Sequence, residues 1–143
     1  MARLKLTTPS QFSFTTNIPV RITDVNYGGH VGNDAILSII HEARMQYLHK
    51  SGYSEVNFEG VGLIMSDVAI DFKNEVFYGD TIIAHVIAND FTKVGFDILY
   101  KLEKIKDDKT VTVALAKTGM VCYDYQARRI AAVPEAAIQK LTV

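Results

Sequence analysis

The chain has 143 residues, of which 48% are hydrophobic and 22% charged, and its formal net charge at pH 7 is -1. This balance excludes a disordered chain and predicts one folded domain over residues 1–143, and the lack of a basic stripe argues against a nucleic-acid partner. Cys122 is the only cysteine, which excludes an intrachain disulfide and a zinc site built on several cysteines.

The first residues, MARLKLTTPSQ, contain no apolar run of the length that a signal peptide needs. No later stretch approaches the length of a membrane span. Together with the single cysteine, which fits a reducing compartment, these observations predict a cytoplasmic protein that does not insert into a membrane.

A strand is predicted over residues 12–24, FSFTTNIPVRITD, because apolar and polar residues alternate there. Pro19 cannot donate to a strand ladder, so an edge strand or a bulge is expected at that point. If the alternation continues, Asp24 and Asn26 face inward. The apolar residues of this strand, expected to face the core, are Phe12, Phe14, Ile18, Val20 and Ile22.

A long helix follows, with Asn33 predicted as its N-cap and Ser51-Gly52 as its stop. The N-terminal half of this helix is apolar over more than a third of its circumference. Such a helix is typically covered on several sides by other elements.

The rest of the chain alternates as strands, and a short helix is predicted from Pro134. The order is one strand, a long helix and then four strands in a meander. One apolar helix against an antiparallel sheet is an α+β arrangement. The four strands are expected at residues 61–74, 81–90, 93–105 and 110–124, with turns at 78–80 and 106–109.

Residues 23–35, TDVNYGGHVGNDA, connect the first strand to the helix and contain acids, amides, glycines and a histidine. Asn, Asp and Gly are ordinary turn residues, but the same side chains could also perform chemistry. Gly28-Gly29 lacks the pattern of a phosphate-binding loop. We expect these glycines to let the backbone turn sharply and a substrate approach closely.

The order of elements and this stretch resemble the hotdog-fold thioesterases, in particular the 4-hydroxybenzoyl-CoA thioesterase-like family. The signature of that family runs D-x-D-x-x-x-H-V-N-N-A and is followed by E-A-R in the helix. The resemblance covers residues 12–141. The matching positions here are Asp24, Asn26, His30, Val31, Gly32, Asn33 and Asp34, followed by Glu42, Ala43 and Arg44.

The resemblance implies a curled antiparallel sheet of about five strands around one long helix. It also implies hydrolysis of an acyl-CoA or acyl carrier protein thioester without a metal or other cofactor. The family further implies a homodimer, with such dimers paired in some cases into a homotetramer.

Two departures from the family motif concern carboxylates. Asn26 stands where the family has its usual catalytic aspartate, and an amide can neither accept a proton from water nor attack a thioester. Gly32 and Asp34 stand where the family has asparagine and alanine. A carboxylate is therefore missing at position 26 and a new one is present at position 34.

Asn26, His30 and Asp34 are the candidate catalytic residues. Asn26 either forms the turn or orients water, and His30 either packs there or transfers a proton. Asp34 is the candidate base, although a charge at the positive end of the helix is its simpler interpretation. Asp24 and Glu42 are minor candidates, with an ion pair to Arg21 or Arg44 expected for Asp24 and a place on the polar helix face for Glu42.

The N–H groups from Val31 to Asp34 would polarise the thioester carbonyl, because the start of a helix has unpaired donors. A non-catalytic binding module is an alternative function, and so is a hydratase or dehydratase that uses His30 with Asp34. Release of free thiol from acyl-CoAs distinguishes hydrolysis from both. The predicted substrate contacts are Gly29, Val31, Gly32, Asn33, Ile36 and Ile40.

Overall fold

The computed structural model describes residues 3–142, so residues 1, 2 and 143 of the predicted domain lie outside the described residues. No helix within residues 3–142 has the length and apolar character needed to cross a membrane. The helices are α1 (Asn33–Lys50) and α2 (Glu135–Leu141). The strands are β1 (Phe14–Pro19), β2 (Gly62–Phe72), β3 (Thr81–Asn89), β4 (Gly95–Lys106), β5 (Lys109–Asp124) and β6 (Arg129–Ile130).

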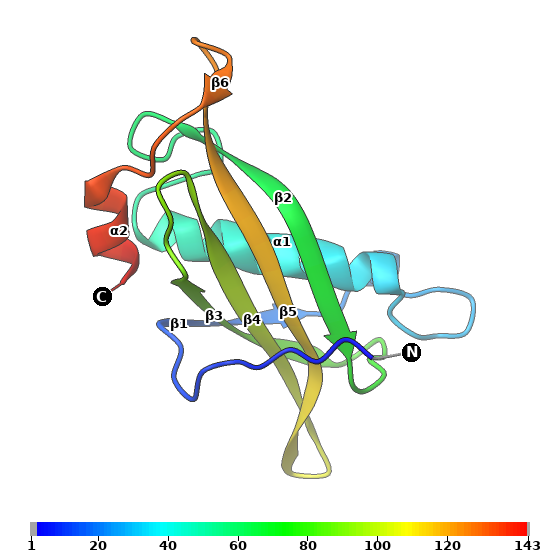
Figure 1. Cartoon of the computed structure of the whole chain (residues 1–143). Coiled ribbons are helices and arrows are strands. Elements are labelled where there is room, and N and C mark those ends of the chain that lie inside the picture. The colour runs from blue at the N-terminus through cyan, green and yellow to red at the C-terminus, as the bar shows by residue number, and fades with distance from the viewer. Residues whose placement is uncertain (1–2, 143) are drawn as a thin grey trace.

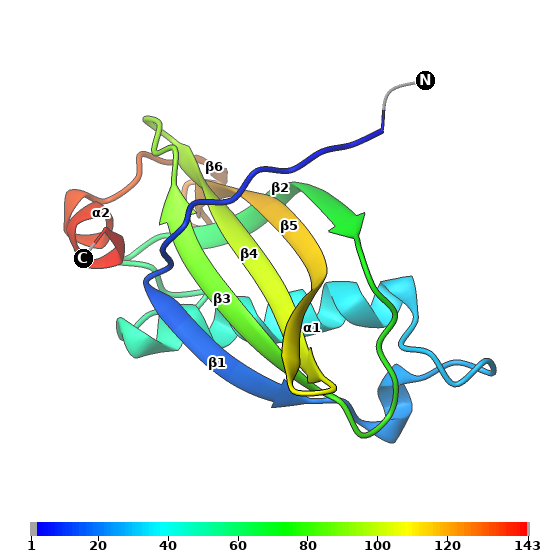
Figure 2. The same ribbon diagram turned by 90° about the horizontal axis from the view of Figure 1, so that it is seen from below.

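The strands form one antiparallel sheet in the order β1-β3-β4-β5-β2, with β6 paired to the end of β5 (Figures 1 and 2). The predicted meander of four strands is therefore wrong for β2, because only β3, β4 and β5 follow one another. After β2, residues 73–80 connect this edge strand to β3, which lies next to the opposite edge strand, β1. Alternation along a strand identifies the strand but says nothing about which neighbour it pairs with.

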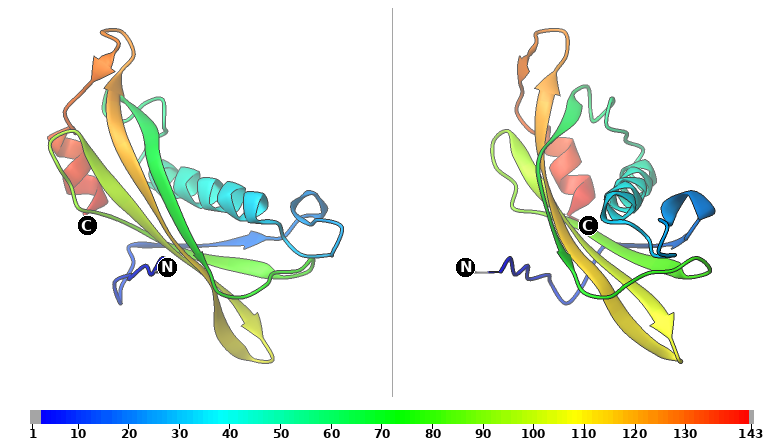
Figure 3. Two further views of the ribbon diagram at one scale, coloured as in Figure 1. Left: turned by 45° about the vertical axis from the view of Figure 1, so that its right-hand side comes forward. Right: turned by 90° about the vertical axis from the view of Figure 1, so that its right-hand side faces the viewer.

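The sheet is twisted, and α1 lies across one of its faces (Figure 3). The face of α1 toward the sheet is apolar apart from Arg44, whereas Leu37 and His41 on the other face are exposed. The predicted α+β class is confirmed, but the sheet covers α1 from one side only. The buried residues of α1 are Ile36, Ile39, Ile40, Ala43, Arg44, Tyr47 and Leu48.

The first strand is shorter than predicted, because β1 ends at Pro19 and residues 22–24 form a single 3₁₀ turn. The Asp24 carboxylate accepts a hydrogen bond from the Arg21 N–H at 2.8 Å, which stabilises this turn. The turn leaves Ile22 68% exposed, so the prediction that Ile22 faces the core is wrong. The prediction that Pro19 lies on an edge strand is confirmed.

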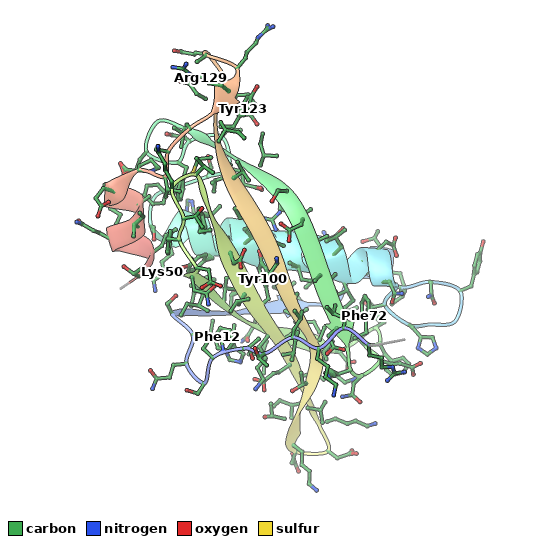
Figure 4. All side chains as sticks on the ribbon, viewed as in Figure 1. Phe12, Lys50, Phe72, Tyr100, Tyr123 and Arg129 are labelled. Carbon is green, nitrogen blue, oxygen red and sulfur yellow. The ribbon has the colours of Figure 1, made fainter. Side chains whose placement is uncertain are left out.

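A polar network inside the core joins α1 to β4 and β5. Arg44 donates to the Tyr100 hydroxyl at 3.3 Å, and that hydroxyl lies 2.7 Å from the Thr118 hydroxyl. Tyr100 lies at the centre of the molecule, between the sheet and α1 (Figure 4). Burial is the main cause that raises the pKa of Tyr100. Glu55 balances the charge of Arg44 at 3.5 Å, so the buried guanidinium is paired.

β2 forms one edge of the sheet and presents apolar side chains to the outside. Ile64, Val68 and Phe72 are 40%, 39% and 46% exposed. A bulge between Met65 and Asp67 interrupts the pairing of β2 with β5. Because bulges shift the alternation, residues before and after this bulge no longer share a face.

Candidate active site

A cleft of about 480 Å³ lies at the N-terminal end of α1. In Figures 1 and 3 the loop before α1, the start of α1 and the end of β2 lie at the same end of the molecule, and Figure 4 shows Phe72 there. The first wall contains Asn26, His30, Val31, Gly32, Asn33, Asp34 and Ile36. The second wall contains Phe72, Lys73, Asn74, Glu75, Val76 and Val113.

Two predicted substrate contacts do not line this cleft. Ile40 is 0% exposed and belongs to the core, because it lies one turn further along the buried face of α1 than Ile36. Gly29 lies in the loop before α1 with a φ of 79°, a conformation that glycine adopts without strain. Its observed role is to let the loop turn.

The side chain of Asn26 organises the loop before α1. Its Oδ1 atom accepts hydrogen bonds from the N–H groups of Gly28 at 2.9 Å and His30 at 3.3 Å. The Asn26 N–H donates to the carbonyl of His30 at 2.8 Å, which closes the loop. The structure thus supports the turn interpretation of Asn26, and only its NH₂ group is left for a ligand in the cleft.

We expect Asn26→Asp to keep the fold and to change the pH–rate profile of the enzyme. An aspartate oxygen can accept hydrogen bonds from the same two N–H groups, so the loop retains these hydrogen bonds. The new carboxylate adds a titrating negative charge to the wall of the cleft. pH–rate curves for the two proteins decide the matter, and superimposable curves would exclude residue 26 from the site.

The N-cap of α1 is Gly32, and the predicted N-cap, Asn33, is the first helical residue. Gly32 has no side chain with which to cap the helix. Val31 donates its N–H to the Val76 carbonyl at 2.8 Å, and Gly32 donates to the Asp24 carbonyl at 3.3 Å. Val31 and Gly32 are therefore not available as donors, contrary to the prediction. The first-turn N–H groups of Asn33, Asp34 and Ala35, which have no partner within a helix, remain.

The Asp34 side chain is exposed and folds back over Gly32. Its Oδ1 atom lies 2.6 Å from the position that a Cβ atom of residue 32 would occupy. This places a carboxylate beside the free N–H groups of the first turn. Gly32 and Asp34, two of the three positions that depart from the family motif, thus lie in direct contact.

His30 lines the cleft between an aromatic ring and an acid. Its ring centroid lies 5.1 Å from that of Phe77, and its Nδ1 atom lies 3.4 Å from Oε1 of Glu75. Sequence reasoning missed Glu75. Its position follows from the contact between Val31 and Val76, which brings together residues far apart in the chain. The only signal in the sequence was an acid soon after the end of a predicted strand.

The loop that carries Glu75 is held by the buried side chain of Lys104. The Lys104 ammonium donates to the Glu75 carbonyl at 2.7 Å and to Oδ2 of Asp80 at 3.0 Å. The Phe77 N–H also donates to Oδ2 of Asp80, at 2.9 Å. Burial acts to raise the pKa of Asp80, but these two donors outweigh it and hold the pKa below its ordinary value. The second wall of the cleft therefore has a fixed backbone.

The side chains of the minor candidates Asp24 and Glu42 line a separate groove and not the cleft. Asp24 is buried, and Arg21 contacts its carboxylate at 3.6 Å, as the structural interpretation predicted. Glu42 accepts a hydrogen bond from Gln46 at 2.6 Å and lines a separate groove beside β1. Neither residue lines the cleft.

Comparison with known proteins gives consistent matches along most of the chain. The family model described as the thioesterase-like superfamily matches residues 20–141. A 1,4-dihydroxy-2-naphthoyl-CoA hydrolase of Nostoc punctiforme is 30% identical over 132 residues, which cover 90% of this chain and 86% of the relative.

Solved structures share the fold at lower identity. A 1,4-dihydroxy-2-naphthoyl-CoA thioesterase from Synechocystis has a TM-score of 0.79 at 22% identity, covering 90% of this chain and 95% of that chain. The 4-hydroxybenzoyl-CoA thioesterase from a Pseudomonas strain has a TM-score of 0.79 at 17% identity, covering 91% and 99%. The predicted hotdog fold is confirmed, and the chain belongs to the thioesterase-like superfamily.

Proposed function

We propose that the protein hydrolyses the thioester of an aromatic acyl-CoA to the free acid and CoA. The observation that carries this proposal is the cleft in which the open N-terminus of α1 meets the carboxylate of Asp34. Thioester hydrolysis is the activity for which the relatives are named, and several of those names specify an aromatic acyl group.

In the proposed reaction the thioester carbonyl oxygen accepts hydrogen bonds from the N–H groups of Asn33 and Asp34. These donors stabilise the negative charge that develops on that oxygen. The Asp34 carboxylate takes a proton from water, and the water oxygen attacks the carbonyl carbon. The carbon–sulfur bond then breaks, and the CoA sulfur leaves as a thiolate that takes up the proton. His30 is the alternative base.

The acyl group is proposed to lie against the apolar part of the cleft. Ile36 comes from the first wall, and Phe72, Val76 and Val113 come from the second. An aromatic ring gains contact area from such side chains, and Asn74 offers a polar group nearby.

Release of free thiol from a panel of aromatic and aliphatic acyl-CoAs tests the function. Hydrolysis of the aromatic members, with kcat/KM well above that of the aliphatic ones, is the expected result. Because Asn26 replaces the usual acid of the family, a non-catalytic binding module is the second candidate. Tight binding of acyl-CoA without thiol release would favour that module, and a change in double-bond absorbance without thiol would favour a hydratase.

We further propose a cytoplasmic homodimer of single-domain chains that pair through the β2 edges of their sheets. The exposed side chains of Val68 and Phe72, which share one face of this edge strand, support the proposal. Phe72 also lines the cleft, so the partner would lie beside it.

A mass measurement in solution at micromolar concentration tests the assembly. We expect at least twice the chain mass of 15.9 kDa, with a tetramer as the larger alternative. Val68→Arg should shift the protein toward the monomer, because it places a charge in the apolar edge. A wild-type protein that remains a monomer would contradict the proposal.

A further inference from the structure

The glycine at the start of α1 has a role that builds on the proposed hydrolysis. We propose that Gly32 is a positioning residue, whose missing side chain leaves the space in which the Asp34 carboxylate lies. The glycine that replaces the asparagine of the family motif and the aspartate that replaces its alanine then form one functional unit.

The backbone gives no reason for a glycine at position 32. Gly32 has a φ of -70° and a ψ of 160°, a conformation that any residue adopts without strain. In contrast, Gly29 and Gly60 have φ values of 79° and 91°, where a side chain causes strain. The requirement at position 32 therefore has to come from its surroundings.

The surroundings of Gly32 contain one neighbour that a side chain would meet. A Cβ atom at this position would lie 2.6 Å from Oδ1 and 3.8 Å from Cγ of Asp34, and no other atom lies within 4 Å apart from the chain neighbours. A distance of 2.6 Å is too short for two non-bonded atoms, so the carboxylate would have to move. A single rotation of the Asp34 side chain accomplishes this at low cost, because that side chain is exposed.

The present position of the carboxylate is the one that the chemistry needs. Asp34 and Gly32 both line the cleft, and the free N–H groups of Asn33 and Asp34 lie in the same helical turn. With the Asp34 carboxylate over Gly32, this base and the N–H groups that donate to the thioester carbonyl occupy the same end of the cleft. A side chain at position 32 would turn the base away from water that is aligned with the thioester, while the donors stay in place.

Gly32→Ala tests this inference because it adds one methyl group and nothing else. We expect kcat to fall at least tenfold, toward the value of Asp34→Asn, with a much smaller change in KM. Gly32→Asn, which restores the family residue, should have at least the same effect. The melting temperature of Gly32→Ala should equal or exceed that of wild type, because alanine lowers the entropy of the unfolded chain.

A double-mutant cycle separates a positioning role from a merely structural one. In the Asp34→Asn background Gly32→Ala should cause no further loss of kcat, because the group that it displaces is already gone. Gly60→Ala is the matched control, far from the cleft at a positive φ, and it should lower the melting temperature while kcat of the folded protein stays unchanged.

Two results would overturn the inference: full activity of Gly32→Ala, or losses that multiply in the double mutant. A wild-type protein that cleaves no acyl-CoA would refute the proposed function instead. The carbon NMR signal of the Asp34 carboxyl group separates these cases, because it can be followed without substrate. It should differ between wild type and Gly32→Ala, and an unchanged signal would exclude the positioning role even if hydrolysis is observed.

Discussion

Asp34→Asn is expected to lower kcat for acyl-CoA hydrolysis by about a hundredfold or more, the usual effect of losing a general base. The amide is nearly isosteric with the carboxylate, but it cannot accept the proton of the attacking water. The N–H groups of Asn33 and Asp34, which donate to the thioester carbonyl in the proposed reaction, are backbone groups and remain in place. We therefore expect KM to change little.

Steady-state kinetics on the best aromatic acyl-CoA, with circular dichroism to verify the fold, measures this effect. Asp108→Asn in the β4–β5 hairpin is a matched control, because it removes an exposed acid outside the cleft. If Asp34→Asn retains full activity, Asp34 is only a favourable charge at the helix start. His30 then becomes the leading candidate for the base.

Lys104→Met is expected to lower the free energy of unfolding by about 2–3 kcal/mol. Lys104 is 5% exposed, and methionine fills most of its volume. The variant leaves the Glu75 carbonyl and the Asp80 carboxylate without their ammonium donor. Because Glu75 and Val76 belong to the second wall of the cleft, kcat/KM should fall as well.

The pH dependence of stability gives a second measurement of the same contact. The pKa of Asp80 is lowered in the folded protein, so its pairing with Lys104 contributes fully above the ordinary aspartate pKa of about 4. The contribution is lost as the pH falls through the lowered value. The difference between wild type and Lys104→Met should thus be constant above about pH 5 and shrink in stronger acid.

Urea unfolding at a series of pH values provides these free energies. Lys109→Met, which removes an exposed lysine, should change the free energy of unfolding by no more than about 0.5 kcal/mol. Equal stability of wild type and Lys104→Met at neutral pH would show that the contacts of Lys104 contribute nothing to holding the loop.

Features that depend on neighbouring residues could be predicted from the sequence. The end of α1 at Ser51 followed by Gly52 agrees with the prediction, and Gly52 adopts a φ of 81°. The β4–β5 turn also lies where KDDK indicated it, with positive φ values at Asp107 and Asp108. In both cases the local backbone requirement is visible in the residue types.

Features that depend on distant contacts could not be predicted. β2 pairs with β5 and not with β3, the next strand in the chain. The alternation of apolar and polar residues along a strand does not indicate which strand it pairs with. Glu75 enters the cleft because Lys104 donates to the Glu75 carbonyl and Val31 donates to the carbonyl of the next residue, Val76. The sequence motif identified the residues of the first wall, because they are close together in the chain. The residues of the second wall are distant in the sequence and meet the first wall only after folding.

The two edges of the sheet differ, and this difference limits how the chain can polymerise. The β2 edge is 11 residues long, whereas β1 has six residues and ends at Pro19, which cannot donate to another strand. In the proposed dimer, pairing through β2 would use up the long edge of both chains. Two short edges that end at proline would then remain, so we expect this assembly to close rather than to grow into a fibre.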